Sequence, residues 1–274
     1  MNRTIRQTGI QEGPNALLRT ITMLYSLVSY AIGVASLVYL ILFIADLWVP
    51  VTINRGAGFA PQAGIATAIL WNVGVVLIWG IQHTLMARPT FKRVWTKVVP
   101  VPIERSTYLI CVAIATVMLV LCWAPMPTVI WDLSGTVLAM LLLGVYFFGW
   151  CITLFSTFLL NHFHLFGLQQ AFIYIRRLQS KQETFQTPLL YKLVRHPMMS
   201  GVLIALWAVP VLTVSRLLFN ILMTTYIFIG LYFEERTLTD ELGDDYKRYL
   251  QTTPSVIPRI SKMKGLDREI SKGA

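Results

Sequence analysis

Charged residues are scarce in this sequence, and their scarcity excludes an ordinary soluble domain. Only 13% of the 274 residues are Asp, Glu, Lys or Arg, which is about half of the roughly 25% found in soluble domains. Hydrophobic residues make up 55% of the chain, and the mean hydropathy is +0.62. A soluble fold cannot bury so much apolar surface, so the composition predicts an integral membrane protein.

Cysteine and histidine are also rare, and this limits the metal and disulfide chemistry open to the chain. Cys111, Cys122 and Cys151 lie within apolar segments and show no Cys-x-x-Cys spacing, so neither a disulfide framework nor a zinc site is indicated. The four histidines are too few for the repeated His-x-x-His boxes of a membrane di-iron centre. We therefore expect no bound metal.

No cleavable signal peptide, internal repeat or low-complexity tract is visible. The first apolar segment is too long for a signal peptide and lacks a cleavage site of small residues, so we expect it to remain as a helix.

Long apolar runs are what the sequence does contain. A run of about 20 residues crosses the ~30 Å hydrocarbon core as a helix, because the backbone must satisfy its own hydrogen bonds in lipid. Four runs are long enough: Leu17 to Leu47, Ala63 to Ala87, Ser106 to Trp123 and Gly135 to Leu160. Two shorter runs follow, Met198 to Leu212 and Leu217 to Phe233. They predict a tight hairpin, and the fold class is an all-α polytopic bundle of about six hydrophobic helices.

The basic residues predict the orientation of this bundle. They gather in the amino-terminal end, the second and fourth connections and the carboxy-terminal tail, whereas the opposite side carries only Arg55 and Arg216. Because basic loops stay in the cytoplasm, both termini are expected there. The net charge of +10 is then a consequence of topology, and we expect no nucleic-acid partner.

Polar residues of possible function concentrate near the predicted cytoplasmic ends of the helices. All four histidines lie there: His83, His162, His164 and His196. Glu234 and Glu235 follow the last apolar run, where a carboxylate is costly unless a cation pairs with it. Arg195 and His196 lie at the other mouth of the same hairpin and are the expected partners. Interfacial histidines and an exposed rim of ion pairs are the alternative readings.

Two stretches that flank the hairpin resemble a known signature. They are Leu193-Val194-Arg195-His196-Pro197-Met198-Met199-Ser200-Gly201 and, after the hairpin, Glu234-Glu235-x-x-Leu238 with Gly243-x-x-Tyr246-x-x-Tyr249. Their order and spacing resemble the carboxy-terminal signature of the isoprenylcysteine carboxyl methyltransferase superfamily. Upstream motifs resemble the bacterial membrane methanethiol S-methyltransferases; they are Gln82-His83, Met86-Ala87-Arg88-Pro89, Pro102 to Tyr108 and Asn161-His162-Phe163-x-Leu165-Phe166-Gly167-Leu168.

The resemblance implies S-adenosylmethionine as methyl donor and a small thiol as acceptor, with methanethiol giving dimethyl sulfide. It implies that the donor site is formed by Leu193, Val194, Arg195, His196, Pro197, Gly201, Glu234 and Glu235. In this scheme Gly201 lets the cofactor approach the helix backbone. For activation of the thiol, the candidates are His83, His162 and Glu235, with the two histidines preferred because imidazole titrates near neutral pH.

The resemblance also implies a division of the chain. Residues 1–186 would form the acceptor chamber and its lid, 187–258 the donor-binding segment and 259–274 a basic tail. Bulky side chains in the first four helices could fill a tunnel for a lipid acceptor, although packing between helices is the commoner reason for such residues, so we expect a small chamber. They include Trp71, Trp79, Tyr146, Phe147, Phe148 and Trp150. The expected location is a bacterial inner membrane, with the donor site facing the cytoplasm.

Two positions depart from the pattern, and other functions remain open. Met199 replaces an aromatic residue of the superfamily, and His164 stands where an acidic residue is expected.

The hairpin signature also resembles membrane sterol reductases and phospholipid or isoprenyl methyltransferases, and a non-catalytic accessory protein is a further alternative. The oligomeric state is left open.

Overall fold

The computed structural model describes residues 15–61, 64–179 and 185–259, and over these ranges the chain is almost entirely helical. Five helices there are long and apolar enough to cross a membrane. These are α1 (Ala16–Ala45), α2 (Ile65–Ala87), α4 (Glu104–Cys122), α5 (Val137–Leu160) and α10 (Val214–Leu242). The predicted all-α polytopic membrane fold is confirmed. Apart from Arg259, the proposed basic tail lies outside the described residues.

Shorter elements connect the long helices. The helical ones are α3 (Pro89–Trp95), the 3-10 turn η1 (Val101–Ile103), α6 (His162–Leu165), α7 (Leu168–Arg176), α8 (Leu190–Leu193), α9 (Pro197–Trp207) and α11 (Asp244–Thr252). Two short strands, β1 (Val129–Asp132) and β2 (Val211–Thr213), pair antiparallel. The sequence analysis did not predict them.

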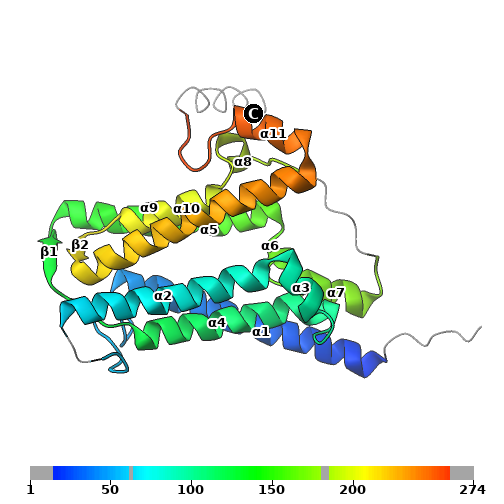
Figure 1. Ribbon diagram of the computed structural model, residues 1–274, viewed down its shortest axis with the longest axis horizontal. Coiled ribbons are helices and arrows are strands. Elements are labelled where there is room, and N and C mark those ends of the chain that lie inside the picture. The colour runs from blue at the N-terminus through cyan, green and yellow to red at the C-terminus, as the bar shows by residue number, and fades with distance from the viewer. Residues whose placement is uncertain (1–14, 62–63, 180–184, 260–274) are drawn as a thin grey trace, which may run out of the picture.

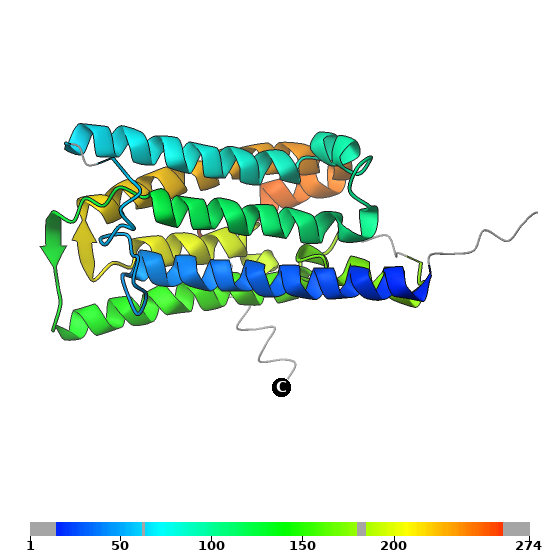
Figure 2. The same ribbon diagram turned by 90° about the horizontal axis from the view of Figure 1, so that it is seen from below.

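The long helices form two layers that run side by side (Figure 1). One layer contains α1, α2 and α4, and the other contains α5, α9 and α10. The view turned by 90° shows the helices of both layers running along the same direction (Figure 2). Helix α5 packs most extensively on α9, α1 packs on α4, and α2 also contacts α10. The last contact joins the two layers.

The flanks of the long helices carry apolar side chains that the protein does not bury. Only 11% of the most apolar stretch of α5, and 39% of that of α10, lies inside the bundle. Leu70, Leu141 and Phe148 are each more than 60% exposed. Such a continuous apolar surface is compatible with lipid and not with water.

The two ends of the bundle differ in charge. The start of α1, helices α3 and α7 and the end of α10 lie at one end, and the β1–β2 pair lies at the other (Figures 1 and 2). The first end carries the described basic residues of α3, α7 and the segments beside them, among them Arg88, Lys92, Arg93, Lys97 and Arg176. The basic loops thus share one end, as the sequence pattern predicted.

The predicted hairpin of two short arms is wrong in length. Helix α9 has only 11 residues, about 16 Å, whereas α10 has 29 residues, about 43 Å. The apolar run ends at Phe233, but Glu234, Glu235 and Arg236 are good helix formers and continue the same helix. Helix α10 ends only at Leu242, before Gly243 with its positive φ of 60°. Both glutamates therefore lie within α10 and not after it.

Arg216 is also placed differently from the expectation. Its side chain is 4% exposed inside the bundle, at the first turn of α10, and is not a loop cation. Its Nη1 atom donates a hydrogen bond to the Ile44 carbonyl, and the guanidinium lies 5.4 Å from the centre of the Tyr146 ring. Carbonyl and ring contacts partly compensate the cation for its loss of hydration.

Hydrogen bonds beside Arg216 fix the start of α10. The Ser215 hydroxyl accepts from the Trp123 indole at 3.0 Å and donates to the Ile53 carbonyl at 2.8 Å. The Trp123 ring packs edge-on against Phe219 at 5.6 Å. These buried contacts join α10 to the end of α4 and to the loop after α1.

Candidate functional site

The Arg-His-Pro motif is held through its backbone by the segment that follows α11. Arg195 and His196 form the entry to α9, where Pro197 occupies the first turn, a position at which proline is favoured. The Arg195 amide donates to the Pro254 carbonyl at 2.9 Å, and the His196 amide donates to the Ser255 carbonyl at 3.1 Å. The segment after α11 therefore lies against the Arg-His-Pro motif.

The side chains converge on a single carboxylate oxygen. Glu235 Oε1 accepts from Arg195 Nη2 at 2.7 Å and from Arg195 Nε at 2.9 Å. It also lies 3.0 Å from His196 Nε2. Charge-assisted bonds of this length are among the strongest in proteins. The structure thus brings together the basic motif and Glu235, which are 40 residues apart in sequence.

Arg195 uses four of its five guanidinium N–H donors within the protein. Its Nη1 atom donates to the Leu250 carbonyl at 3.2 Å and also to the Thr253 carbonyl. With Nε and Nη2 bound to Glu235, the guanidinium joins α10 to the segment after α11. Its first task is to hold these elements together.

Glu234 and His196 form the more accessible half of the cluster. The Glu234 side chain is 52% exposed, and one of its oxygens lies 3.8 Å from His196 Nδ1. The His196 side chain is 8% exposed and lies between the two carboxylates. Glu234 is the acidic group of this cluster that can still reach a ligand.

The apolar residues of the motif take different places. Val194 and Pro197 are buried, and Leu193 is partly buried beside them. The role expected for Gly201 is contradicted, because its open face packs on α5 and is not available to a cofactor. A Cβ on its partner Gly149 would lie 2.5 Å from the Gly201 carbonyl oxygen. This glycine pair permits the close approach of α9 and α5.

Four aromatic residues surround the ion cluster, and sequence reasoning assigned them no role. The rings of Phe185, Tyr246 and Tyr249 contact one another at 5.5 to 6.0 Å. Burial raises the pKa of Tyr191 and Tyr246 above the usual range and that of Tyr249 to about 12. The Tyr246 hydroxyl is buried and has no hydrogen-bond partner among the described residues. The spacing Gly243-x-x-Tyr246-x-x-Tyr249 was the signal available in the sequence.

His162 lies apart from this cluster and is fully satisfied. Its Nε2 atom is 2.8 Å from the Tyr30 hydroxyl, and its Nδ1 atom is 2.7 Å from the Thr157 hydroxyl. The ring stacks on Phe158 at 4.2 Å with an angle of 4° between the planes. Burial lowers the pKa of His162. Both nitrogens are occupied, so this histidine connects α1 to α5.

His83 lies on α2 in a different environment. Its Nδ1 atom is buried and has no hydrogen-bond partner among the described residues. Its ring stacks on Trp79 at 5.1 Å and also contacts Tyr108 and Tyr226. The structure therefore separates the two histidines that the sequence treated as equivalent.

The other aromatic residues that could fill a tunnel divide into two groups. Tyr146 is buried in the core, and Phe147 and Trp150 pack against the same core. Phe148 and Trp71 are 62% and 38% exposed on the outside of the bundle, which contradicts that role for both. Trp79 alone of the six contacts His83.

The described ranges contain no group of three or more His, Cys, Asp or Glu residues that could hold a metal ion. The three cysteines there are free.

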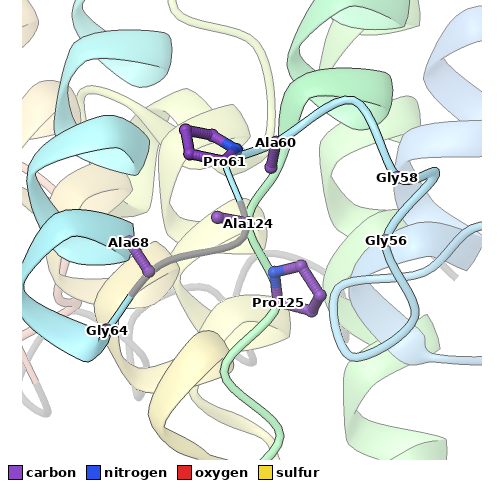
Figure 3. Close-up of a pocket in the computed structure, with 8 residues that line it drawn as sticks. All are labelled: Gly56, Gly58, Ala60, Pro61, Gly64, Ala68, Ala124 and Pro125. Carbon is purple, nitrogen blue, oxygen red and sulfur yellow. The ribbon is translucent and has the colours of Figure 1, made fainter.

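A cavity of about 590 Å³ lies near the ends of α2 and α4, lined by small residues and prolines (Figure 3). Its lining residues are Gly56, Gly58, Ala60, Pro61, Gly64, Ala68, Ala124 and Pro125. None of these side chains can ionise, so this cavity offers no acid–base chemistry.

Known proteins resemble this chain over most of its length. A methanethiol S-methyltransferase of Bradyrhizobium diazoefficiens is 42% identical over 242 residues, which is 88% of this chain and 92% of that protein. A methanethiol S-methyltransferase of Mycobacterium tuberculosis is 40% identical and covers 88% of this chain and 97% of its own length. Nurim of Bos taurus is 28% identical over 60% of this chain and 65% of its own. No family model and no solved structure matches.

Proposed function

This chain belongs to the methanethiol S-methyltransferase family, a family of methyltransferases, and we propose that it methylates methanethiol with S-adenosylmethionine as the donor. The products are dimethyl sulfide and S-adenosylhomocysteine. The observation that carries this proposal is identity near 40% over almost the full length of relatives with that activity in their names. The similarity includes the helices of both layers.

The donor site that we propose is the ion cluster with its aromatic surround. S-adenosylmethionine supplies an electrophilic methyl group on a sulfonium when it is bound. Glu234, half exposed beside His196, is suited to bind an ammonium group, and His196 Nδ1 faces the same space. The unpartnered Tyr246 hydroxyl offers a further hydrogen bond to a polar ligand.

Arg195 and Glu235 have a supporting role in this site. Bonds to Glu235 and to two backbone carbonyls use four of the five guanidinium N–H donors, and the positive charge still attracts the donor's carboxylate. Val194 and Pro197, with Leu193 at their edge, provide apolar surface for the adenine side. Gly201 is left out of the donor site, because α5 covers it.

The orientation that we propose places the donor site in the cytoplasm of a bacterial cell, at the inner membrane. It is supported by the basic residues around α3 and α7, since basic loops stay inside. Single cysteines introduced into a cysteine-free chain at Arg55 and Leu178, both in loops, test this orientation. A membrane-impermeant maleimide added to intact cells should label position 55 and not position 178. The reverse pattern would overturn the orientation.

The activity is tested by analysis of the gas phase above purified protein. Protein in detergent with methanethiol and S-adenosylmethionine should release dimethyl sulfide, and omission of either substrate should abolish it. Titration calorimetry should show heat with S-adenosylhomocysteine and none with a reduced nicotinamide cofactor. Heat from the nicotinamide alone would favour a reductase instead.

Acceptor size separates a small-thiol enzyme from one that acts on lipids. The rate should fall from methanethiol to ethanethiol to propanethiol, because each added methylene must displace a packed wall at a cost of about 1 to 3 kcal/mol. Rates that stay level along the series, or good turnover of a farnesylated cysteine, would contradict the small-thiol assignment.

A further inference from the structure

His83 is a partly buried base whose Nδ1 atom lacks a partner, and aromatic rings surround it. Trp79 lies nearly parallel to its ring, with a centroid distance of 5.1 Å and an angle of 19° between the planes. Tyr108 from α4 and Tyr226 from α10 approach at 5.9 and 6.5 Å. The Nδ1 atom is shielded and makes no hydrogen bond within the described residues. Buried polar atoms without partners are uncommon, and each one requires an explanation.

The neighbouring hydrogen bonds hold this enclosure in place. The Tyr108 hydroxyl donates to the His83 carbonyl at 3.2 Å, and the Trp79 indole donates to the Thr116 hydroxyl at 3.2 Å. The Tyr226 hydroxyl is 2.9 Å from that of Thr84. Three helices are thereby tied around the imidazole, while its Nδ1 atom is left unbound.

The other candidate bases already have hydrogen-bond partners. Both nitrogens of His162 lie at hydrogen-bonding distance from hydroxyl groups. Glu235 Oε1 receives Arg195 and His196 at 2.7 to 3.0 Å. Of the three residues that the sequence offered for activation of the thiol, His83 alone has a buried nitrogen left unpaired.

The enclosure and the proposed donor site both include residues of α10. Tyr226 and Glu234 are eight residues apart on this helix, which corresponds to about 12 Å. Arg88 follows the end of α2, and its guanidinium lies 5.2 Å from the ring of Phe233, the residue before Glu234. The enclosure therefore lies about two helical turns from Glu234 along α10.

We propose that His83 is the catalytic base that accepts the proton of the thiol, and that Trp79, Tyr108 and Tyr226 enclose the acceptor. The inference rests on the proposed function and names the residue that performs its proton transfer. As the thiol S–H bond breaks, its proton passes to His83 Nδ1. The sulfur electron pair forms the new bond to the methyl carbon, and the electrons of the broken C–S bond return to the donor's sulfur. The donor's sulfonium becomes a neutral thioether while the imidazole becomes an imidazolium, so one positive charge is present before and after the step.

The aromatic walls suit both reactants. Sulfur makes favourable contacts with aromatic rings, and a cationic sulfonium is attracted by their faces. Of the groups facing the imidazole, Tyr108 and Tyr226 are titratable. Glu104 and Arg105, of opposite charge, act on Tyr108 from the first turn of α4. The three rings that face the imidazole carry no charge at neutral pH, because tyrosine side chains are then un-ionised.

The test compares wild type, His83→Gln and His83→Asn in detergent, with methanethiol and methaneselenol as acceptors. At pH 7 both variants should methylate methanethiol about 10²- to 10⁴-fold more slowly, the usual contribution of a general base. Their rates should rise about tenfold per pH unit as the thiol ionises by itself. Methaneselenol is the stronger acid and is already ionised, so its methylation should stay near the wild-type rate. Affinity for S-adenosylhomocysteine should not change.

His164→Gln is the matched control, a histidine change at the same end of the bundle outside the enclosure, and its rates and pH profile should equal those of wild type. Wild-type rates and pH profile in both His83 variants would overturn the role of His83. An equal loss for thiol and selenol would also overturn it, because a merely structural residue gives that result. A wild type that methylates no thiol would overturn the proposed function itself, and this inference with it.

Discussion

Replacement of Glu235 by glutamine keeps the shape of the side chain and removes the charge that Arg195 and His196 share. Three contacts of 2.7 to 3.0 Å end on Glu235 Oε1. An amide oxygen can still accept hydrogen bonds, but the guanidinium, whose side chain is only 11% exposed, loses its counter-charge. The cost is therefore mainly electrostatic.

The magnitude follows from the distance and the partial burial. Opposite charges about 4 Å apart attract by about 4 kcal/mol at an effective dielectric constant near 20. The Glu235 side chain is 22% exposed, so solvent screens part of this attraction and about 2 to 3 kcal/mol remains. For a chain of this size that loss lowers the melting temperature by roughly 4 to 10 °C.

Thermal unfolding in detergent, followed by tryptophan fluorescence, measures this shift. Asp244→Asn is the matched control, because its pair with Lys247 is exposed, at 85% and 58%, and should contribute almost nothing. Glu235→Gln should also weaken binding of S-adenosylhomocysteine, since Glu235 helps to position His196. A melting temperature within 1 °C of wild type would refute the reasoning that this ion pair fastens the site.

Three further predictions concern packing, donor binding and pH. Gly201→Ala should lower the free energy of unfolding by about 1 to 3 kcal/mol, measured by thermal melts, because the added methyl group meets the backbone of Gly149. Tyr246→Phe should keep or slightly raise the melting temperature, since it removes an unpaired buried hydroxyl. The same variant should bind S-adenosylhomocysteine more weakly in calorimetry, and unchanged affinity would exclude Tyr246 from the site. Burial lowers the pKa of His162 below its unfolded value of about 6.5. The unfolded state therefore binds more protons, and the free energy of unfolding falls as the pH drops below about 6.5. Thermal melts from pH 7.5 to 5 should show a smaller decline in melting temperature for His162→Gln than for wild type.

The sequence predicted the crossing helices well and the last hairpin poorly. The bounds of α1, α2, α4 and α5 all differ from the expected ones by two residues or fewer. Apolar runs of bilayer length leave the backbone no alternative to a helix. The end of α10 was missed because hydropathy stops at Phe233, whereas helix formation depends on propensity and continues to Leu242.

The sequence predicted which charged residues of the site pair with one another, but not the surroundings of its glycine and histidines. The hairpin geometry was enough to bring Arg195 and His196 to Glu235. It was not enough to show that Gly201 meets α5, because that contact depends on Gly149, far away in sequence. The difference between His83 and His162 was equally hidden, since the partner that occupies His162 is Tyr30, 132 residues earlier.

Because α10 is continuous, its length sets the distance between the proposed donor site and the opposite end of the bundle. Ser215 and Arg216 are fixed there by Trp123, Ile53 and Ile44, and Glu235 follows Arg216 by 19 residues, about 28 Å, on one unbroken helix. Each residue of an α-helix advances the chain by 1.5 Å and turns it by about 100°. Insertion or loss of a single residue between the two points would rotate Glu235 away from Arg195 without touching either side chain, so in this helix the number of residues matters as much as their identity.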